Sequence, residues 1–274
     1  MESTSLVDLH MHTRCSDGIW DVERLLDEVR VRDLGLFCIS DHDTLDAYPL
    51  PEDLASRAIP GLEVDSHLGG HTVHLLAYGV CDKTSPLMNA LCRQRSAREE
   101  RMASMVDAVR RHGIDVSLDD VRAQARGTAS LGRPHLARAL VACGAVPSVQ
   151  DAFDRYLADD ANSYVALERL TAADAIALIH ASCGVAIAAH PMRLRNDSDL
   201  AELIDEGIDG IEIVHPTADP QAQARLLETA RANGLLSTAG TDFHAPLEGR
   251  PIGVPFPTFE IDRLREALDR RARQ

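Results

Sequence analysis

Short apolar runs alternate with amphipathic stretches towards both ends of the chain. The apolar, often β-branched runs predict buried strands over 5–9, 34–40, 61–65, 71–78, 184–189, 210–214 and 235–240. A helical spacing of apolar positions, with Gly after several segments, predicts helices over 21–33, 172–182, 198–206, 220–233 and 259–273. Alternation of this kind indicates an α/β fold with a parallel sheet covered by helices, or a barrel.

The middle of the chain differs, because strand signals vanish between residues 85 and 166. A long amphipathic helix rich in Arg and Glu is predicted there, followed by shorter ones, over 90–113, 117–126, 133–143 and 148–157. We therefore expect three segments, with 1–84 and 167–274 forming the α/β fold and 85–166 an all-α insertion. In the first segment, Pro49 and Pro51 are expected to limit the helix before residue 61 to about two turns.

Histidine and carboxylate side chains recur where the predicted strands end. The first run leads into His10-Met11-His12, and because alternate residues of a strand share a face, both imidazoles point to one place. Later runs contain or lead into Asp41-His42-Asp43, Glu63, His74, His190-Pro191 and Asp242-Phe243-His244. Such groups seldom lie against apolar strands unless they are paired or ligated. The series therefore predicts a metal cluster at the strand ends, where α/β folds place their chemistry.

This series resembles the PHP (polymerase and histidinol phosphatase) family of metal-dependent phosphoesterases. The resemblance rests on four motifs in the family's order: His10-x-His12 with Asp17, Asp41-His42, His190-Pro191 and Asp242-x-His244. It implies a distorted (β/α)7 barrel with metals at its C-terminal face and the all-α insertion as a cap. The layout is most similar to the TrpH-like group of bacterial nucleoside 3',5'-bisphosphate phosphatases and 5'-3' exoribonucleases.

The same resemblance implies a trinuclear metal centre. One metal is expected on His10, His12, Glu63 and Asp242. A second would share Glu63 and add His74 and His190, and a third would be held by Asp17, His42 and His244. The ligands also expected to serve catalysis are Asp17, His42, Glu63, His190, Asp242 and His244.

The ligand types limit the choice of metal. Imidazoles and carboxylates without a thiolate suit Mn, Fe or Zn, whereas Mg prefers more oxygen ligands. We expect two to three divalent metals, with Mn favoured over Fe and Zn. The expected reaction is attack by a metal-bound hydroxide, because coordination lowers the pKa of water toward neutrality.

Three residues outside the ligand set are candidates for contacting substrate phosphates. Arg133 and His135 begin a predicted insertion helix and resemble the group's Arg-x-His signature, and Arg193 follows His190-Pro191. A guanidinium binds phosphate oxygens through two parallel hydrogen bonds. The competing interpretation is that these arginines are solvent-exposed helix-end residues. His135 is also a candidate to protonate the leaving oxygen.

Residues beside the motifs are given supporting or structural roles. Asp41 is expected to orient a ligand imidazole, and Asp43 to cap a helix or turn. His215 follows a predicted strand and is a weaker candidate for the site. The remaining histidines match no motif and are interpreted as structural: His67, His71, His112 and His180.

Composition narrows the class and the compartment. The 274 residues are 45% hydrophobic and 26% charged, which is ordinary for a soluble globular protein. No apolar run is long enough to span a bilayer, and charged residues come too early for a secretory leader. Six scattered cysteines predict neither a disulfide framework nor a thiolate zinc site, so we expect a reducing cytoplasm.

The net charge bears on the partners. A formal charge of −15 argues against a broad basic surface for long nucleic acid. It permits a small phosphorylated nucleotide or a short RNA end. The sequence indicates no membrane contact and no protein partner.

The resemblance implies hydrolysis of a phosphomonoester in a nucleoside 3',5'-bisphosphate, as in pAp to AMP and phosphate. The alternative is a 5'-3' exoribonuclease on short or 5'-phosphorylated RNA, which needs the same metals but room for a longer chain. Histidinol phosphatase ranks third, because the insertion and Arg133-x-His135 argue against it. A non-catalytic PHP module predicts missing ligands, and none is missing from the motifs.

Overall fold

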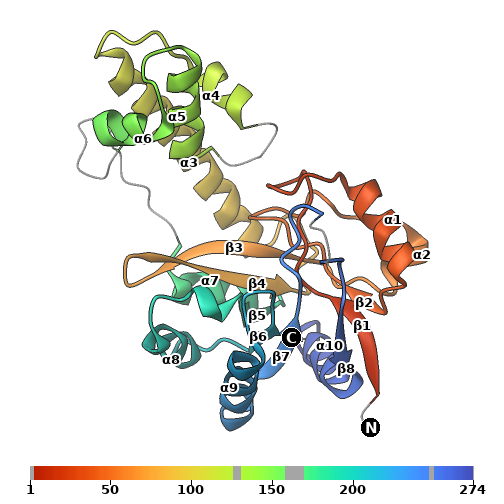
Figure 1. Cartoon of the computed structure of the whole chain (residues 1–274). Helices are drawn as coiled ribbons and strands as arrows, with labels where there is room; N and C mark the ends of the chain where they lie inside the picture. The colour runs from red at the N-terminus through yellow and green to blue at the C-terminus, as the bar shows by residue number, and fades with distance from the viewer. Residues whose placement is uncertain (1–2, 126–130, 158–169, 247–249, 274) are drawn as a thin grey trace. The chain divides into compact units, whose positions relative to one another are not determined.

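The computed structural model describes residues 3–125, 131–157, 170–246 and 250–273 (Figure 1). The chain divides into two compact units. The first combines Met1–Ala90 with Arg169–Gln274, and the second is Leu91–Glu168. The first unit has the α/β fold expected from the sequence and carries the predicted metal ligands.

A three-stranded sheet has the order β2-β1-β8. Strand β1 (Thr4–Asp8) is parallel to β2 (Leu36–Phe37) and antiparallel to β8 (Val254–Pro257). The apolar pattern missed β8, because two of its four residues are proline. Proline cannot donate to a ladder, so it is confined largely to edge strands, and β8 is an edge of this sheet.

A five-stranded sheet has the order β3-β4-β5-β6-β7. Its strands are β3 (Gly61–Leu68), β4 (His71–Tyr78), β5 (Val185–Ala188), β6 (Gly210–Val214) and β7 (Leu236–Ala239). β3 and β4 form a hairpin, β4 is antiparallel to β5, and β5, β6 and β7 are parallel. Gly69 and Gly70 form the hairpin turn with φ of 53° and 90°, a two-residue geometry that favours glycine at both positions.

Isolated bridges connect the two sheets near the site. Met11 bridges Phe243 beyond the ends of β1 and β7, and His42 bridges Glu63 between the chain after β2 and strand β3. Both bridges are parallel. The ladders of the described strands form two separate sheets rather than one closed ring, so the distorted barrel stays a prediction.

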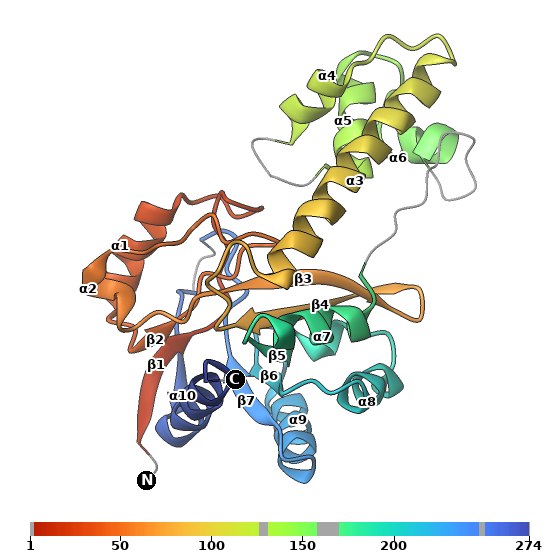
Figure 2. The ribbon, with the colours of Figure 1, turned by 180° about the vertical axis from the view of Figure 1, so that it is seen from behind.

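Helices cover the outside of the five-stranded sheet (Figure 2). Helix α7 (Ala172–Ala181) lies against β3, β4 and β5, while α9 (Pro220–Ala232) lies against β6 and β7. The other α-helices of this unit are α1 (Val22–Arg32), α2 (Glu52–Ala55), α8 (Asp197–Asp205) and α10 (Thr258–Arg271). The helices expected from the apolar spacing are confirmed within one or two residues at most ends. None of the helices in the described ranges combines the length and the hydrophobicity needed to cross a bilayer.

The prediction of about two helical turns before β3 is wrong. Helix α2 has only four residues, which make one turn. Pro51 is its N-cap residue, so the helix cannot extend back through Pro49 and Pro51. The chain before α2 is held instead by Tyr48, whose hydroxyl accepts from the backbone N–H of Ile39 at 3.0 Å.

Buried apolar and aromatic side chains support the strand ends that carry the site. One cluster includes Leu9, Tyr78 and Ile187, which are at most 1% exposed. A second cluster includes Met11, Ile39 and Phe243, each next to a predicted ligand or close to one in sequence. Because these apolar positions alternate with the ligands, the strand register that buries them also turns the polar side chains to the other face.

Helices are the only regular elements among the described residues of the second unit. It contains most of α3 (Pro86–Arg110), then α4 (Leu118–Gln124), α5 (Arg133–Ala142), α6 (Val149–Ala152) and the π-helical turn η1 (Phe153–Leu157). It has its own apolar core, which includes Met102, Val121, Leu136 and Leu140. The expected role of this insertion as a cap stays a prediction.

Candidate metal centre

The first unit brings all nine predicted metal ligands into one network of close imidazole and carboxylate contacts. His10 and His12 follow β1, His190 follows β5, and Asp242 and His244 follow β7. His42 follows β2 and bridges Glu63 of β3, next to His74 of β4. The ligands converge because the parallel strands β1, β2, β5 and β7 end on one side of the fold.

Glu63 is the hub of the cluster and is only 1% exposed. Its Oε2 atom lies 3.3 Å from Nε2 of His10, 3.2 Å from Nε2 of His12 and 3.4 Å from Nε2 of His42. Its Oε1 atom lies 2.8 Å from Nδ1 of His74 and 2.9 Å from Nε2 of His190. The two oxygens therefore face two different sets of imidazoles, as a bridging carboxylate would.

Three groups of ligand atoms are close enough to hold an ion, with atoms within 4.8 Å of one another. His10, His12, Glu63 and Asp242 form the first and coincide with the first expected set. The second contains His42, Glu63 and His74, and the third contains His12, Asp17, His42 and His244. His190, expected in the second set, is not part of this group, but its Nε2 atom lies 2.9 Å from Oε1 of Glu63, which is.

Several ligand atoms of the buried group have no hydrogen-bond partner. These atoms are Nε2 of His10, Nε2 of His12 and Oε2 of Glu63, all excluded from solvent. A buried polar atom without a partner costs roughly 1–3 kcal/mol, so such atoms are rare unless something else satisfies them. A divalent cation would bind all three, and the residues present therefore fit a metal.

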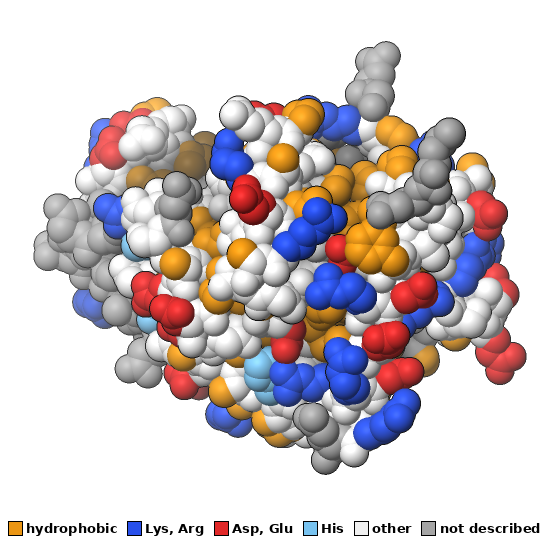
Figure 3. Space-filling view, turned by 90° about the horizontal axis from the view of Figure 1, so that it is seen from below, with side chains coloured by type: hydrophobic (Ala, Val, Ile, Leu, Met, Phe, Trp, Pro, Cys, Tyr) orange, Lys and Arg blue, Asp and Glu red, His pale blue; other side chains and the backbone are white. Residues whose placement is uncertain are grey.

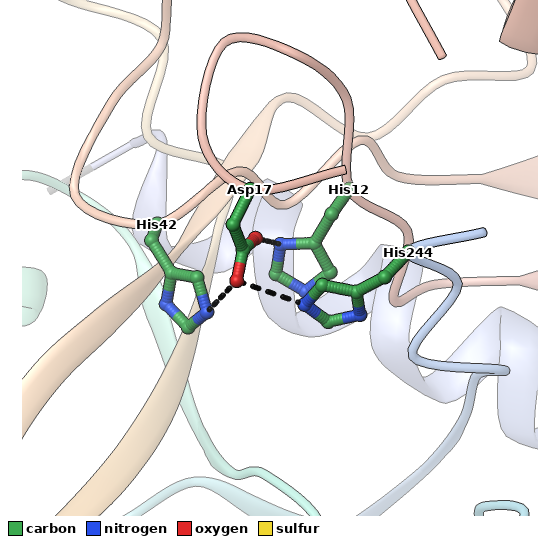
Figure 4. Close-up of side chains that lie close together, drawn as sticks. All are labelled: His12, Asp17, His42 and His244. Atoms are coloured by element: carbon green, nitrogen blue, oxygen red, sulfur yellow. Dashed lines mark ion pairs between the residues drawn. The ribbon is translucent and has the colours of Figure 1, made fainter. Parts of the chain in front are cut away.

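The third group, drawn in Figure 4, contains the more exposed ligands Asp17 and His244. The Asp17 carboxylate sits among three imidazoles, 3.2 Å from Nε2 of His244 and 3.7 Å from both Nδ1 of His12 and Nε2 of His42. The Asp17 side chain is 47% exposed, whereas His10, His12 and Glu63 are at most 1% exposed. This gradient indicates that a ligand from solvent reaches the cluster from the side of Asp17.

The cluster separates charge strongly between its imidazoles and its carboxylates. Burial acts to lower the pKa of His42, but the carboxylates of Glu63, Asp65 and Asp17 raise it to about 10. Burial acts to raise the pKa of Asp17, but a hydrogen bond from His244 and the charges of His42 and His12 lower it to about 2. The pKa of His10 is likewise raised well above its usual value, since Glu212 and Glu63 outweigh its burial.

We expect metal binding at pH 7 to release protons. The raised pKa values of His10 and His42 mean that these imidazoles are protonated without metal, and a metal binds only the neutral form. Apparent metal affinity should therefore rise with pH until it passes about 10, where His42 has lost its proton. Titration calorimetry in two buffers of different ionisation enthalpy measures the release. A binding heat independent of the buffer would contradict this charge assignment.

Glu212 is a supporting residue that the sequence did not single out. It is fully buried on β6, and its Oε1 atom lies 3.0 Å from Nδ1 of His10. Its Oε2 atom accepts a 2.6 Å hydrogen bond from the backbone N–H of His190. Because Nδ1 of His10 donates to this carboxylate, the proton that His10 would release to bind a metal is the one on Nε2, which faces Glu63 and Asp242. The only sequence signal is a buried carboxylate in the middle of an apolar strand.

The ligands after β5 and β7 have strained backbones. His190 and Asp242 adopt φ of 28° and 51°, in the left-handed region that non-glycine residues seldom occupy. Such residues cost roughly 1–3 kcal/mol each and cluster at functional sites. Gly240 allows the close approach of these segments, because a Cβ there would lie 2.3 Å from Cβ of His10.

Buried aspartates hold the ligand loops together. Asp8 accepts hydrogen bonds from the backbone N–H groups of Thr241 at 3.0 Å and Gly253 at 2.8 Å. Its burial raises its pKa to about 6, although these hydrogen bonds act to lower it. Asp41 accepts from the hydroxyls of Thr13 at 2.7 Å and Ser16 at 2.6 Å. The structure therefore places Asp41 on the loop that carries Asp17, rather than directly on an imidazole as expected.

Asp65 contacts two ligands that the sequence did not connect to it. Its Oδ1 atom lies 3.3 Å from both Nδ1 of His42 and Nε2 of His74. Asp43, expected to cap a helix or turn, accepts from the backbone N–H of Asp65 at 3.0 Å. These two aspartates orient the imidazoles on the β3 side of the cluster.

Of the histidines outside the ligand set, His215 lies beside the cluster, and the others have partners elsewhere. His215 is buried after β6, with Nε2 3.3 Å from Oδ2 of Asp242, so it belongs to the site's surroundings. His67 contacts the carbonyl of Leu170, and His180 pairs with Asp209 at 2.8 Å, away from the cluster. The remaining two also have local partners: His71 with Asp199, and His112 with Tyr156.

The three candidate substrate contacts lie in different settings. Arg193 is half-exposed, with a side-chain nitrogen 3.1 Å from Oδ2 of Asp242. Arg133 donates to the carbonyl of Leu157 at 3.0 Å inside the second unit. Nδ1 of His135 accepts from the backbone N–H of Gly132 at 2.9 Å, and burial lowers the pKa of His135. Of the three, only Arg193 is in the first unit.

Comparison with known proteins identifies the class. No protein-family model matches the chain. It is 32% identical to the 5'-3' exoribonuclease Rnm of Escherichia coli, over 91% of this chain and 90% of that protein. It is also 32% identical to a 3',5'-nucleoside bisphosphate phosphatase of Chromobacterium violaceum, over 90% of both.

A solved structure from Bifidobacterium adolescentis, assigned to the metal-dependent phosphoesterases, is 28% identical with a TM-score of 0.71. The alignment covers 97% of this chain and 98% of that one. The fold and the ligand cluster define a metal-dependent phosphoesterase. The chain belongs to the PHP family of these enzymes.

Proposed function

We propose that this enzyme hydrolyses a phosphomonoester of a nucleoside 3',5'-bisphosphate, converting pAp to AMP and phosphate. The observation that carries the proposal is the buried group of His10, His12, Glu63 and Asp242, whose unsatisfied atoms call for a metal. The similarity to a bisphosphate phosphatase over 90% of the chain supports the substrate class. The distorted barrel and a cap formed by the insertion belong to the same proposal, and the two parallel bridges between the sheets support the barrel.

We propose two to three divalent metals on the nine ligands, with Mn favoured over Fe or Zn. When bound, such metals supply a water nucleophile of lowered pKa and neutralise charge on the phosphoryl group. Glu63 and Asp242 keep negative charge for this purpose, because the surrounding imidazoles lower the pKa of both carboxyls well below the usual range, against their burial. Asp17 and His244, the more exposed ligands, are where substrate would meet the cluster.

Arginine and histidine side chains would hold the substrate. Arg193 lies beside Asp242, where its guanidinium would contact oxygens of the phosphate that is cleaved. Arg133 and His135 are proposed to contact the substrate, on the Arg-x-His resemblance alone. His190 stays neutral, because burial lowers its pKa more than Glu63 raises it, so it binds metal without losing a proton.

The surface charge favours a small substrate. On the face drawn in Figure 3, acidic and basic side chains intermingle around apolar patches. A long nucleic acid requires an extended run of cationic contacts to phosphates, which a net charge of −15 disfavours. We therefore place a soluble, cytoplasmic nucleotide or short RNA end ahead of a long polymer.

The test is phosphate release by the wild-type protein with Mn, comparing pAp, AMP and a short 5'-phosphorylated RNA. We expect one phosphate from pAp at a rate well above that from AMP, loss of turnover with a chelator and recovery when Mn is restored. Release of mononucleotides from RNA in preference would move the function to a 5'-3' exoribonuclease, the reading that the similarity to Rnm supports. No metal-dependent turnover of any of the three would refute the proposal.

A further inference from the structure

A cavity of about 470 Å³ adjoins the metal centre within the first unit. Its walls include the ligand Asp242 together with His215, and its size falls in the usual range of small-molecule sites, roughly 300–1,000 Å³. The lining comes from the exits of β6 and β7 and from the segment that leads into β8. A substrate whose reacting phosphate lies on the metals would extend into this space.

Much of the cavity wall is apolar, but it also carries two arginines. Val214, Pro216, Phe243 and Pro251 provide apolar surface, and the arginines are Arg193 and Arg250. An apolar wall with a few polar groups at fixed positions is the common design of a ligand site. The two arginines could bind phosphates while the apolar wall packs against a sugar or a base, a combination that suits a nucleotide.

The two arginines differ in their partners. Arg193 has a side-chain nitrogen 3.1 Å from Asp242, whereas no carboxylate in the described part of the chain pairs with Arg250. A guanidinium cannot lose its charge at physiological pH. In a protein with a net charge of −15, an arginine that lines an apolar cavity and pairs with none of the described carboxylates is available to bind an external anion.

The contacts inside the second unit strengthen the case for Arg250. Arg133 donates to a backbone carbonyl and its guanidinium lies 5.8 Å from the ring centre of Phe153. His135 uses Nδ1 at the start of its own helix. Both side chains have structural partners, while Arg250 has no described carboxylate partner and lines a cavity that includes a metal ligand.

We infer that Arg250 binds a second phosphate of the substrate, beyond the phosphate that is cleaved, with the rest of the nucleotide against the apolar wall of this cavity. This inference rests on the proposed function and deepens it. The same contact would serve the other phosphate of a nucleoside bisphosphate or the next phosphodiester of a short RNA. Arg250 is a specificity residue in this assignment, because no hydrogen bond or ion pair among the described residues joins it to the ligand cluster.

The test compares wild type with Arg250→Ala and Arg250→Lys on pAp, AMP and a 5'-phosphorylated dinucleotide, in the presence of Mn. We expect Arg250→Ala to raise KM for pAp about tenfold, the scale of losing one charge-assisted hydrogen bond, and to change KM for AMP less than twofold. The lysine variant should recover part of the loss, since it keeps the charge but not the planar fork. A matching rise for the dinucleotide would assign the same contact to an internucleotide phosphate.

Arg231→Ala, at an exposed arginine of α9 outside this cavity, is the matched control, and Arg133→Ala tests the rival residue in the same assay. Equal KM values for Arg250→Ala and wild type on pAp, or equal rises on pAp and AMP, would overturn the inference while leaving the proposed function intact. If wild type does not turn over, titration calorimetry with pAp still decides. At least tenfold weaker binding by Arg250→Ala supports the inference, and equal or absent binding overturns it.

Discussion

The substitution Glu63→Gln is expected to abolish metal-dependent turnover and to lower metal affinity by more than about 100-fold, the upper end for residues that only support ligands. Glu63 is the one side chain whose two oxygens face five imidazoles, those of His10, His12, His42, His74 and His190. An amide keeps the shape but replaces one oxygen by a nitrogen that donates hydrogen bonds. It also removes the negative charge that faces all five imidazoles.

The measurement is the metal content after dialysis, by elemental analysis, together with phosphate release. The matched control is Glu260→Gln, which removes an equally buried carboxylate that pairs with Arg263 on α10. This control should keep its metal and its turnover. Retention of a full metal complement by Glu63→Gln, with the fold intact by circular dichroism, would refute the central position of Glu63.

The second large effect is expected at Glu212, which contacts ligands without belonging to the expected ligand set. Glu212→Gln should weaken metal binding by about 10- to 100-fold, the usual cost of removing an outer partner of a ligand. Both oxygens of Glu212 accept hydrogen bonds, from Nδ1 of His10 and from the backbone N–H of His190. A glutamine has one acceptor, so in either orientation its amide group faces a donor or forces His10 into the other tautomer.

A metal titration separates this positioning role from loss of the fold. Saturating Mn should restore most of the turnover of Glu212→Gln, because the ligands remain and only their orientation is weakened. Glu260→Gln again serves as the control for loss of a buried carboxylate. Turnover that stays low at saturating Mn with a lowered melting temperature would assign Glu212 a purely structural role. Unchanged metal affinity would contradict both the tautomer and the orientation arguments.

Local pattern predicted most elements of the fold, and its failures have specific causes. The helices over 172–181 and 220–232 have apolar spacing and clear caps, with Thr171 and Asp219 accepting from the third residue beyond. Strand β8 was not predicted, because its prolines are untypical of a strand and remove ladder donors. Helix α2 has one turn instead of two, because Pro51 is its N-cap residue. Whether the strands close into a barrel depends on pairings between distant segments, which no local pattern encodes.

The order of the ligand motifs, with its resemblance to the PHP family, allowed the nine candidate ligands to be named from the sequence, and most of them lie in or just beyond an apolar strand. The tertiary structure added what surrounds them. Glu212 lies 202 residues from His10 in sequence, so a local pattern gives no sign of their contact. Asp8 joins β1 to Thr241 and Gly253 in the same way. Arg250 became a candidate substrate contact only because it lines the same cavity as Asp242.

The sequence by itself determined the class of chemistry, since the types and the spacing of strand-end ligands are local properties of the chain. Only the tertiary structure decided which oxygen of Glu63 faces which imidazoles, which nitrogen of His10 donates to Glu212, and that Arg250 lines a cavity together with Asp242. The physical reason is that these features depend on distances of about 3 Å between residues far apart in sequence, the length of a hydrogen bond. Those distances exist only once the strands have packed and turned their polar ends together.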